Sequence, residues 1–304
     1  MTKQAIRKIT PFLVISVAVM ILIQFSVPTA IVNAIAIAMV LLIGIPHGAI
    51  DHILYENTTG RSRASFYTFY LGSMALYAII WLLSPKIGLW SFILLSAYHF
   101  GQSQFSDLTV SPNKLRALYL FWGLSILGAL LYHNPTEIRR YFDWIPSLEG
   151  SAELLTNQFF GYCTLFFTIM TLILMIVLLR REGTKERLVM ELLQFAAIHI
   201  VFFIFPLLPA FALYFALLHS LPVMIEEFQF IKKKKGIDGR SFILLMLPFT
   251  IFSLLGMAVL FAVFYFRLTE QPQVLLLFIL IAVLTLPHSI VMERFYAVFY
   301  GNSD

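Results

Sequence analysis

The sequence predicts an all-α membrane protein, a single domain covering residues 1–304 and built as a bundle of about ten transmembrane helices. Composition is the first reason: 60% of the residues are hydrophobic and 12% are charged, whereas soluble domains have about 45–50% and about 25%. Hydrophobic segments are the second reason, because apolar windows of about 20 residues, long enough to cross a bilayer, recur along the whole chain. Little sequence is left over for a soluble domain.

The ten windows follow one another with short polar connections between them. They cover residues 10–27, 30–52, 66–84, 88–106, 115–132, 158–180, 188–206, 208–231, 242–266 and 272–299. The first resembles the core of a signal peptide, but no small-residue cleavage site precedes the second, so we expect an uncleaved first span. The longest connection, residues 133–157, is acidic and aromatic and is expected to form an external cap, with an interfacial helix as one possible form.

Basic residues predict the orientation. With ten spans, 17 of the 21 Lys and Arg residues fall on one face of the membrane and 4 on the other. Positive charge stays on the cytoplasmic side, so both termini are expected in the cytoplasm of a multi-pass protein of the plasma membrane. The net charge of +5 is accounted for by these short loops, and no nucleic-acid partner is expected.

Polar residues interrupt the second span in the stretch Gly44–Tyr55. A histidine or carboxylate at membrane depth is costly and therefore indicates function. Pro46 cannot donate a helical hydrogen bond, so the backbone should open near His47. His47 and Asp51 are four residues apart, which on a helix puts the carboxylate where it can orient the imidazole. A kinked helix with a buried, hydrogen-bonded histidine is the alternative.

Four histidines lie on even-numbered spans, all of which run in the same direction through the membrane. They are His47, His99, His219 and His288. Four imidazoles at similar depth can converge on one ion, and neutral imidazole suits iron, copper or zinc. These histidines are the candidate metal ligands and catalytic residues. His199 lies on an odd-numbered span and is expected to pack or to line a substrate site.

Further polar residues follow these histidines and are expected to hold the ligand rings in place. They are Asp51, His52, Gln104 and Glu293. For Glu293 an interfacial charge is an equal alternative.

Four features of the sequence carry a family resemblance: Pro-His-Gly-Ala-x-Asp at 46–51, Tyr-His-Phe-Gly at 98–101, the mid-span His219 and Leu-Pro-His at 286–288. Over essentially the whole chain, the sequence resembles the Brp/Blh family of bacterial and archaeal β-carotene 15,15′-dioxygenases. The resemblance implies an integral-membrane enzyme with an Fe(2+) cofactor. Such an enzyme cleaves the central double bond of β-carotene with O2 and releases two molecules of retinal, which implies a functional link to a microbial rhodopsin in the same lipid bilayer.

By position, the resemblance assigns iron binding to His47, His99 and His219, and His288 matches the C-terminal Pro-His motif and can complete the set. Two positions depart from the family pattern. Gln104 stands where the second motif often has an aspartate, and Val223 stands where the third motif can carry a second histidine. Three alternatives therefore stay open: another membrane metalloenzyme acting on a carotenoid, isoprenoid or lipid, a bis-histidine haem protein, and a non-enzymatic transporter or pigment-delivery protein.

A catalytic metal needs open coordination positions, and a set of neutral imidazoles leaves them. A long hydrocarbon dissolves in the bilayer, so lateral access between spans is expected. Tyr98, Phe100 and Phe215, close to His99 and His219 in sequence, are the candidate substrate contacts.

Overall fold

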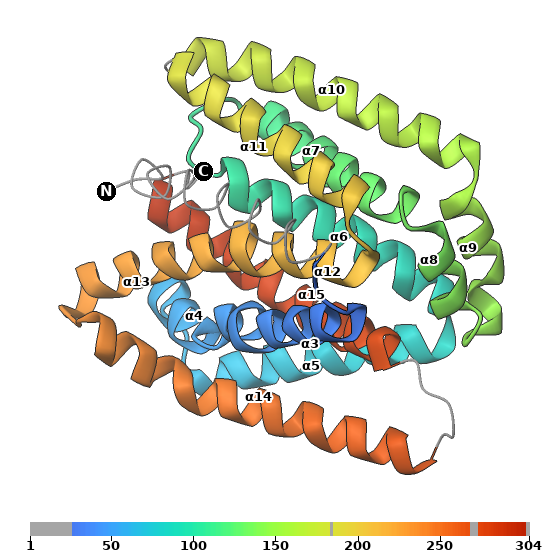
Figure 1. Cartoon of the computed structure of the whole chain (residues 1–304). Coiled ribbons are helices and arrows are strands. Elements are labelled where there is room, and N and C mark those ends of the chain that lie inside the picture. The colour runs from blue at the N-terminus through green and yellow to red at the C-terminus, as the bar shows by residue number, and fades with distance from the viewer. Residues whose placement is uncertain (1–25, 183–184, 268–272, 302–304) are drawn as a thin grey trace.

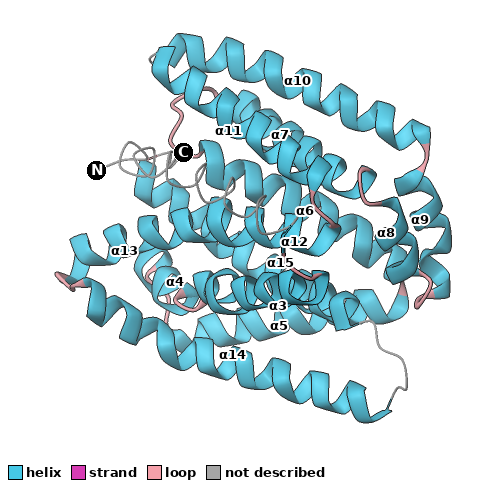
Figure 2. Ribbon diagram, in the orientation of Figure 1, coloured by secondary structure: helices cyan, strands magenta, loops and turns pink. Residues whose placement is uncertain are grey.

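The computed structural model describes residues 26–182, 185–267 and 273–301, and these residues form helices and connections without a strand (Figure 1 and Figure 2). The α-helices are α3 (Thr29–Met39), α4 (Asp51–Thr59), α5 (Arg63–Leu83), α6 (Pro85–Phe105), α7 (Pro112–Tyr132), α8 (Pro135–Phe142), α9 (Glu149–Thr156), α10 (Gln158–Glu182), α11 (Lys185–Ile204), α12 (Leu207–Ala212), α13 (Leu221–Lys235), α14 (Gly239–Arg267) and α15 (Gln273–Tyr300). The predicted all-α class is confirmed.

Irregular helical turns join some of these helices. They are the π-helix η1 (Val40–Gly44), the 3-10 helices η2 (Ile45–Gly48) and η3 (Pro146–Leu148), and the π-helix η4 (Leu213–Ser220). Two long segments are therefore composite: α3 continues through η1 and η2 towards α4, and α12 continues through η4 into α13.

Eight helices of the described part are long and apolar enough to cross a membrane. They coincide with eight of the predicted spans. The predicted span 88–106 is also one helix, α6, but its polar residues keep it outside that set. The predicted span 10–27 lies outside the described residues apart from its last two. The number of ten spans and the cytoplasmic position of both termini stay predictions.

Two glycines allow α6 and α7 to pack backbone against backbone. A Cβ atom on Gly101 would lie 2.0 Å from the carbonyl oxygen of Tyr119, and one on Gly123 would lie 1.9 Å from that of Ala97. Such close approach is the usual role of small residues between membrane helices. α6 is thereby fixed in the middle of the bundle, with α10 and α11 on one side and α5 and α14 on the other (Figure 1).

We expect Gly101→Ala and Gly123→Ala to destabilise the fold strongly, because each added methyl group overlaps a backbone atom that cannot move alone. Overpacking of this kind costs about 1–3 kcal/mol or more. Thermal unfolding in detergent measures the effect. Gly72→Ala on α5 is the matched control, since no atom lies within 4 Å of its added Cβ, and an equal loss in all three variants would contradict the packing argument.

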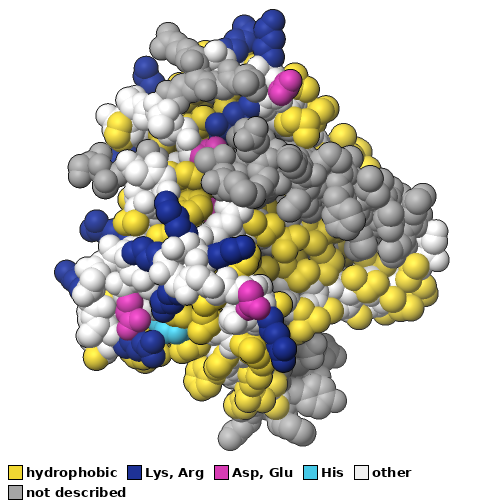
Figure 3. Space-filling model, turned by 90° about the vertical axis from the view of Figure 1, so that its left-hand side faces the viewer, with side chains coloured by type: hydrophobic (Ala, Val, Ile, Leu, Met, Phe, Trp, Pro, Cys, Tyr) yellow, Lys and Arg dark blue, Asp and Glu magenta, His cyan; other side chains and the backbone are white. Residues whose placement is uncertain are grey.

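The two ends of the bundle differ in charge. Basic side chains gather at the end where α13 stops and α14 begins (Figure 3); there the Lys234 amine donates to the Asn57 carbonyl oxygen and Arg63 pairs with Glu56. At the opposite end, α8, η3 and α9 close the bundle (Figure 1). The segment predicted as a cap is thus helical, and it lies opposite the basic end.

Candidate metal centre

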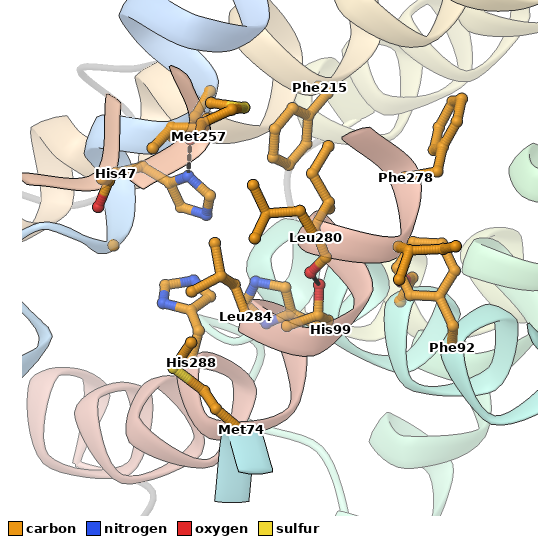
Figure 4. Close-up of a pocket in the computed structure, with 18 of the residues that line it drawn as sticks. His47, Met74, Phe92, His99, Phe215, Met257, Phe278, Leu280, Leu284 and His288 are labelled. Atoms are coloured by element: carbon orange, nitrogen blue, oxygen red, sulfur yellow. Dashed lines mark hydrogen bonds between the residues drawn. The ribbon is translucent and has the colours of Figure 1, made fainter. Parts of the chain in front are cut away.

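Four buried histidines from four different elements meet inside the bundle. His47 belongs to η2, His99 to α6, His219 to η4 and His288 to α15. Each of His47 and His99 makes edge-on ring contacts with both His219 and His288, at centroid distances of 4.6–5.2 Å. Figure 4 shows the rings of His47, His99 and His288 around a common space. The predicted convergence is therefore present in the structure; below we call these four residues the histidine cage.

The nitrogen atoms of the histidine cage suit a metal ion. His47, His99 and His219 each offer one nitrogen, and these three atoms lie within 4.8 Å of one another. The Nε2 atoms of all four rings, and also Nδ1 of His99, are buried without a hydrogen-bond partner among the described residues. Leaving such a nitrogen unpaired costs about 1–3 kcal/mol, and a bound divalent ion would remove that cost.

Three of the rings, those of His47, His219 and His288, are held through their Nδ1 atoms. The Nδ1 atom of His47 faces the carbonyl oxygen of Gly44, and Nδ1 of His219 lies 3.0 Å from the hydroxyl oxygen of Ser103. A carbonyl oxygen can only accept, so His47 carries its proton on Nδ1 and keeps the Nε2 lone pair free. Partners of this kind fix the orientation and tautomer of metal-ligating histidines.

Asp51 holds His288 rather than His47, which corrects the expectation from the four-residue spacing. Its carboxylate lies 2.9 Å and 3.0 Å from Nδ1 of His288 and accepts a hydrogen bond of 2.9 Å from the hydroxyl group of Tyr70. The reason is local: His47 lies in a 3-10 turn, and α4 begins only at Asp51. The spacing of an α-helix therefore does not apply between His47 and Asp51.

Irregular backbone occurs at two of the four histidines. The opening expected at Pro46 is confirmed by the π-helix η1 and the 3-10 helix η2 around His47, and His219 lies in the π-helix η4. Such π-turns are frequent at functional sites. His99 and His288 instead sit in uninterrupted α-helices. Gly101, two residues after His99, allows the close contact with α7. Pro287 lies inside α15.

Glu293 reaches the histidine cage through a neighbour. It accepts hydrogen bonds from the amide nitrogen of Gln102 and, at 3.4 Å, from the hydroxyl group of Tyr98. Gln102 follows His99 by three residues on α6, so Glu293 is linked to the helix that carries His99. Tyr98 directs its hydroxyl group to Glu293 and is not among the residues that line the cavity described below.

The two other predicted supporting residues have different surroundings. Gln104 donates to Glu191 at 2.5 Å and to Gln194 at 3.4 Å; both lie on α11, which carries none of the four cage histidines. The ring of His52 lies tilted against that of Phe249, with the centroids 4.3 Å apart, and His52 lies in the cavity wall. Neither contact places Gln104 or His52 against a cage ring.

A large apolar cavity adjoins the cage. Its volume is about 1120 Å³, above the usual range of about 300–1,000 Å³ for small-molecule sites. Phe100 and Phe215, two of the predicted substrate contacts, line it together with the four histidines. Phe215 stacks on His219 at 5.8 Å and meets His47 edge-on at 5.5 Å. A Cβ on Gly44 would lie 2.6 Å from the Phe215 ring, so glycine is needed there.

Comparison with known proteins agrees with this arrangement. The family described as Beta-carotene 15,15'-dioxygenase matches residues 37–296. The chain belongs to this family. It is 24% identical over 269 residues to the Beta-carotene 15,15'-dioxygenase of uncultured marine bacterium 66A03, covering 85% of this chain and 92% of that protein. No solved structure matches.

The matched region contains all four cage histidines, and also Gln104 and Val223. Val223 is buried in an apolar cluster that includes Val291 and Met292, on the helix of His288.

Sequence reasoning missed two contacts of the candidate site. Ser103 bonds His219, and Tyr70 bonds Asp51. Ser103 lies one helical turn after His99, so the sequence could predict that both residues share a face of α6. It could not predict the partner of Ser103, which lies on η4. Tyr70 lies in an ordinary apolar span, and nothing in its spacing marks it.

Proposed function

We propose that this protein is a membrane dioxygenase that uses iron(II) and O2 to cleave the central 15,15′ double bond of β-carotene, giving two molecules of retinal. Family membership and the name of the relative support the reaction. One structural observation carries the proposal: four buried imidazoles with unpartnered nitrogens lie in the wall of a large apolar cavity. A hydrocarbon held there would lie beside the metal in a cavity lined mostly by apolar side chains.

His47, His99 and His219 would hold the iron, with His288 as the fourth imidazole. Neutral nitrogen ligands suit iron(II) and leave its positive charge uncompensated. When bound, the iron activates O2 for reaction with the double bond. Gly44, Ser103 and Asp51 keep three of the rings in the orientation that presents Nε2 to the ion.

The cavity provides room for a substrate on more than one side of the centre. One part of its lining comes from α8 and η3 at the capped end, and another from α5 and α14. In Figure 4, Phe92 and Phe278 lie to one side of His99, and Met257 lies to the other. Cleavage at the middle of a long molecule requires such an arrangement, because half of the substrate must extend each way from the reacting bond.

Access from the lipid is supported by the exposure of cavity-lining residues on α5 and α14. Leu71 is 60% exposed and Phe252 is 76% exposed, and both line the cavity. In a bilayer these side chains contact acyl chains, so β-carotene dissolved in the membrane can enter between α5 and α14 without passing through water. The enzyme would act in the plasma membrane and supply retinal to a rhodopsin there.

The test is expression in cells whose membranes contain β-carotene, with products separated by chromatography. We expect loss of β-carotene and formation of retinal in a ratio of about two retinal molecules per substrate molecule. A longer apocarotenal would show a different cleavage position. Purified protein that contains iron but forms no carotenoid product would favour another apolar substrate, and protein that takes up no iron would favour a pigment carrier.

A further inference from the structure

Two buried acidic residues on α13, Glu226 and Glu227, have no role in the proposed reaction. Glu227 on α13 is fully buried, and neither of its carboxylate oxygens has a hydrogen-bond partner among the described residues. Burying a carboxylate between membrane helices without a partner is costly and marks function. Packing alone does not explain an acidic side chain at this position.

The charged groups that act on Glu227 are themselves acidic, namely Asp51 and Glu226. Glu226 is buried as well and accepts a hydrogen bond of 2.7 Å from the hydroxyl group of Tyr300. Two of the lysines that end α13 have other contacts: Lys234 donates to a backbone carbonyl, and Lys232 lies over the ring of Phe228 at 5.6 Å.

These three acids lie between the histidine cage and the basic end of the bundle. Asp51 touches His288, whose ring is 4.6 Å from that of His47. Glu226 and Glu227 follow His219 by about two helical turns, in the direction of the lysines that end α13. Arg187, whose charge acts on Tyr300, is paired with Asp107 at 2.7 Å. Its charge is therefore compensated and does not close this path to a cation.

A divalent ion must reach the cage by some route, and the apolar cavity is a poor one because an ion in hydrocarbon is strongly disfavoured. We propose that Asp51, Glu226 and Glu227 form a transit site that passes a divalent cation from the basic, predicted cytoplasmic end of the bundle to the histidine cage. Carboxylate oxygens suit such ions, and the cage imidazoles then take over as ligands. This inference rests on the metal centre of the proposed function.

The test is the rate of metal uptake by the full-length protein. Protein stripped with a chelator is mixed with Co²⁺ as the probe, and the visible absorption of histidine-bound cobalt is followed in time. We expect Glu227→Gln to slow the growth of this band by about 10-fold or more, while the final amplitude and the cobalt dissociation constant stay as in the unchanged protein. Glu227→Asp keeps a carboxylate and should load at an intermediate rate.

Glu191→Gln is the matched control, because Glu191 is also buried but lies on α11, where it contacts Gln104 and Arg187. It should load at the normal rate. Normal loading by Glu227→Gln would overturn the transit site, and so would a reduced final amplitude, which would make Glu227 part of the cage. Should Glu227→Gln fail to fold, the rate of Glu227→Asp decides. Failure of the unchanged protein to bind cobalt would overturn the metal centre itself, whereas cobalt binding without retinal formation would overturn only the proposed substrate.

Discussion

His99→Ala should remove both the bound iron and the formation of retinal. His99 is buried, and neither ring nitrogen has a hydrogen-bond partner among the described residues, so metal binding is the role that accounts for its position. We expect the iron content to fall close to zero. Loss of a residue that only orients a metal ligand typically lowers activity by about 10–100-fold, and we expect retinal formation to fall further than that. His47→Ala and His219→Ala should behave alike, because one nitrogen from each of the three lies within 4.8 Å of the others.

His199→Ala is the control, because His199 is a half-buried histidine inside the bundle but outside the cage. Its Nδ1 faces the Phe195 carbonyl oxygen at 2.9 Å and its Nε2 lies 3.2 Å from the Ser125 hydroxyl oxygen, so both nitrogens are used within the helix packing. We expect this variant to keep its iron and its product. Iron content measured by mass spectrometry, retinal measured by chromatography and thermal unfolding together separate metal loss from misfolding. Unchanged iron in His99→Ala would refute the metal centre.

The fold followed from hydrophobicity because a bilayer imposes one length on every crossing helix. The predicted windows and the observed helices agree within a few residues over the described part of the chain. The convergence of the histidines was also accessible, since residues at similar depth on neighbouring helices can meet when they face the same space. α6 shows the limit of the hydropathy argument: His99, Gln102 and Ser103 lower its apolar character because it carries the site.

The partners within the site were not accessible from sequence, because they depend on contacts between distant helices. Asp51 and His288 are 237 residues apart, and only the packing of α15 against α4 brings them together. Helical spacing gave the wrong partner for Asp51, since Pro46 and the 3-10 turn break the register between His47 and α4. Gln104 was expected to hold a ligand ring because it is close to His99 in sequence, but its side chain faces α11 in the structure.

Asp51→Ala is the second substitution for which we expect a large effect. It leaves Nδ1 of His288 and the hydroxyl group of Tyr70 without their common partner inside the bundle. Loss of a carboxylate that orients a ligating histidine typically lowers metal affinity or activity by about 10–100-fold. We expect a loss in this range for iron affinity, measured by competition with a chelator, together with a lower unfolding temperature of the metal-free protein.

Graded variants identify the contact responsible. Asp51→Asn keeps an acceptor for His288 but removes the charge, and Tyr70→Phe removes only the hydrogen bond to the carboxylate, so both losses should be smaller than that of Asp51→Ala. Glu56→Gln is the control on the same helix, because its exposed ion pair with Arg63 is of a kind that contributes about 0–1 kcal/mol to stability.

Asp51→Ala with normal iron affinity would show that His288 does not bind the metal. Since Asp51 belongs to both groups, its loss should change affinity as well as loading rate, whereas loss of Glu227 should change the rate alone.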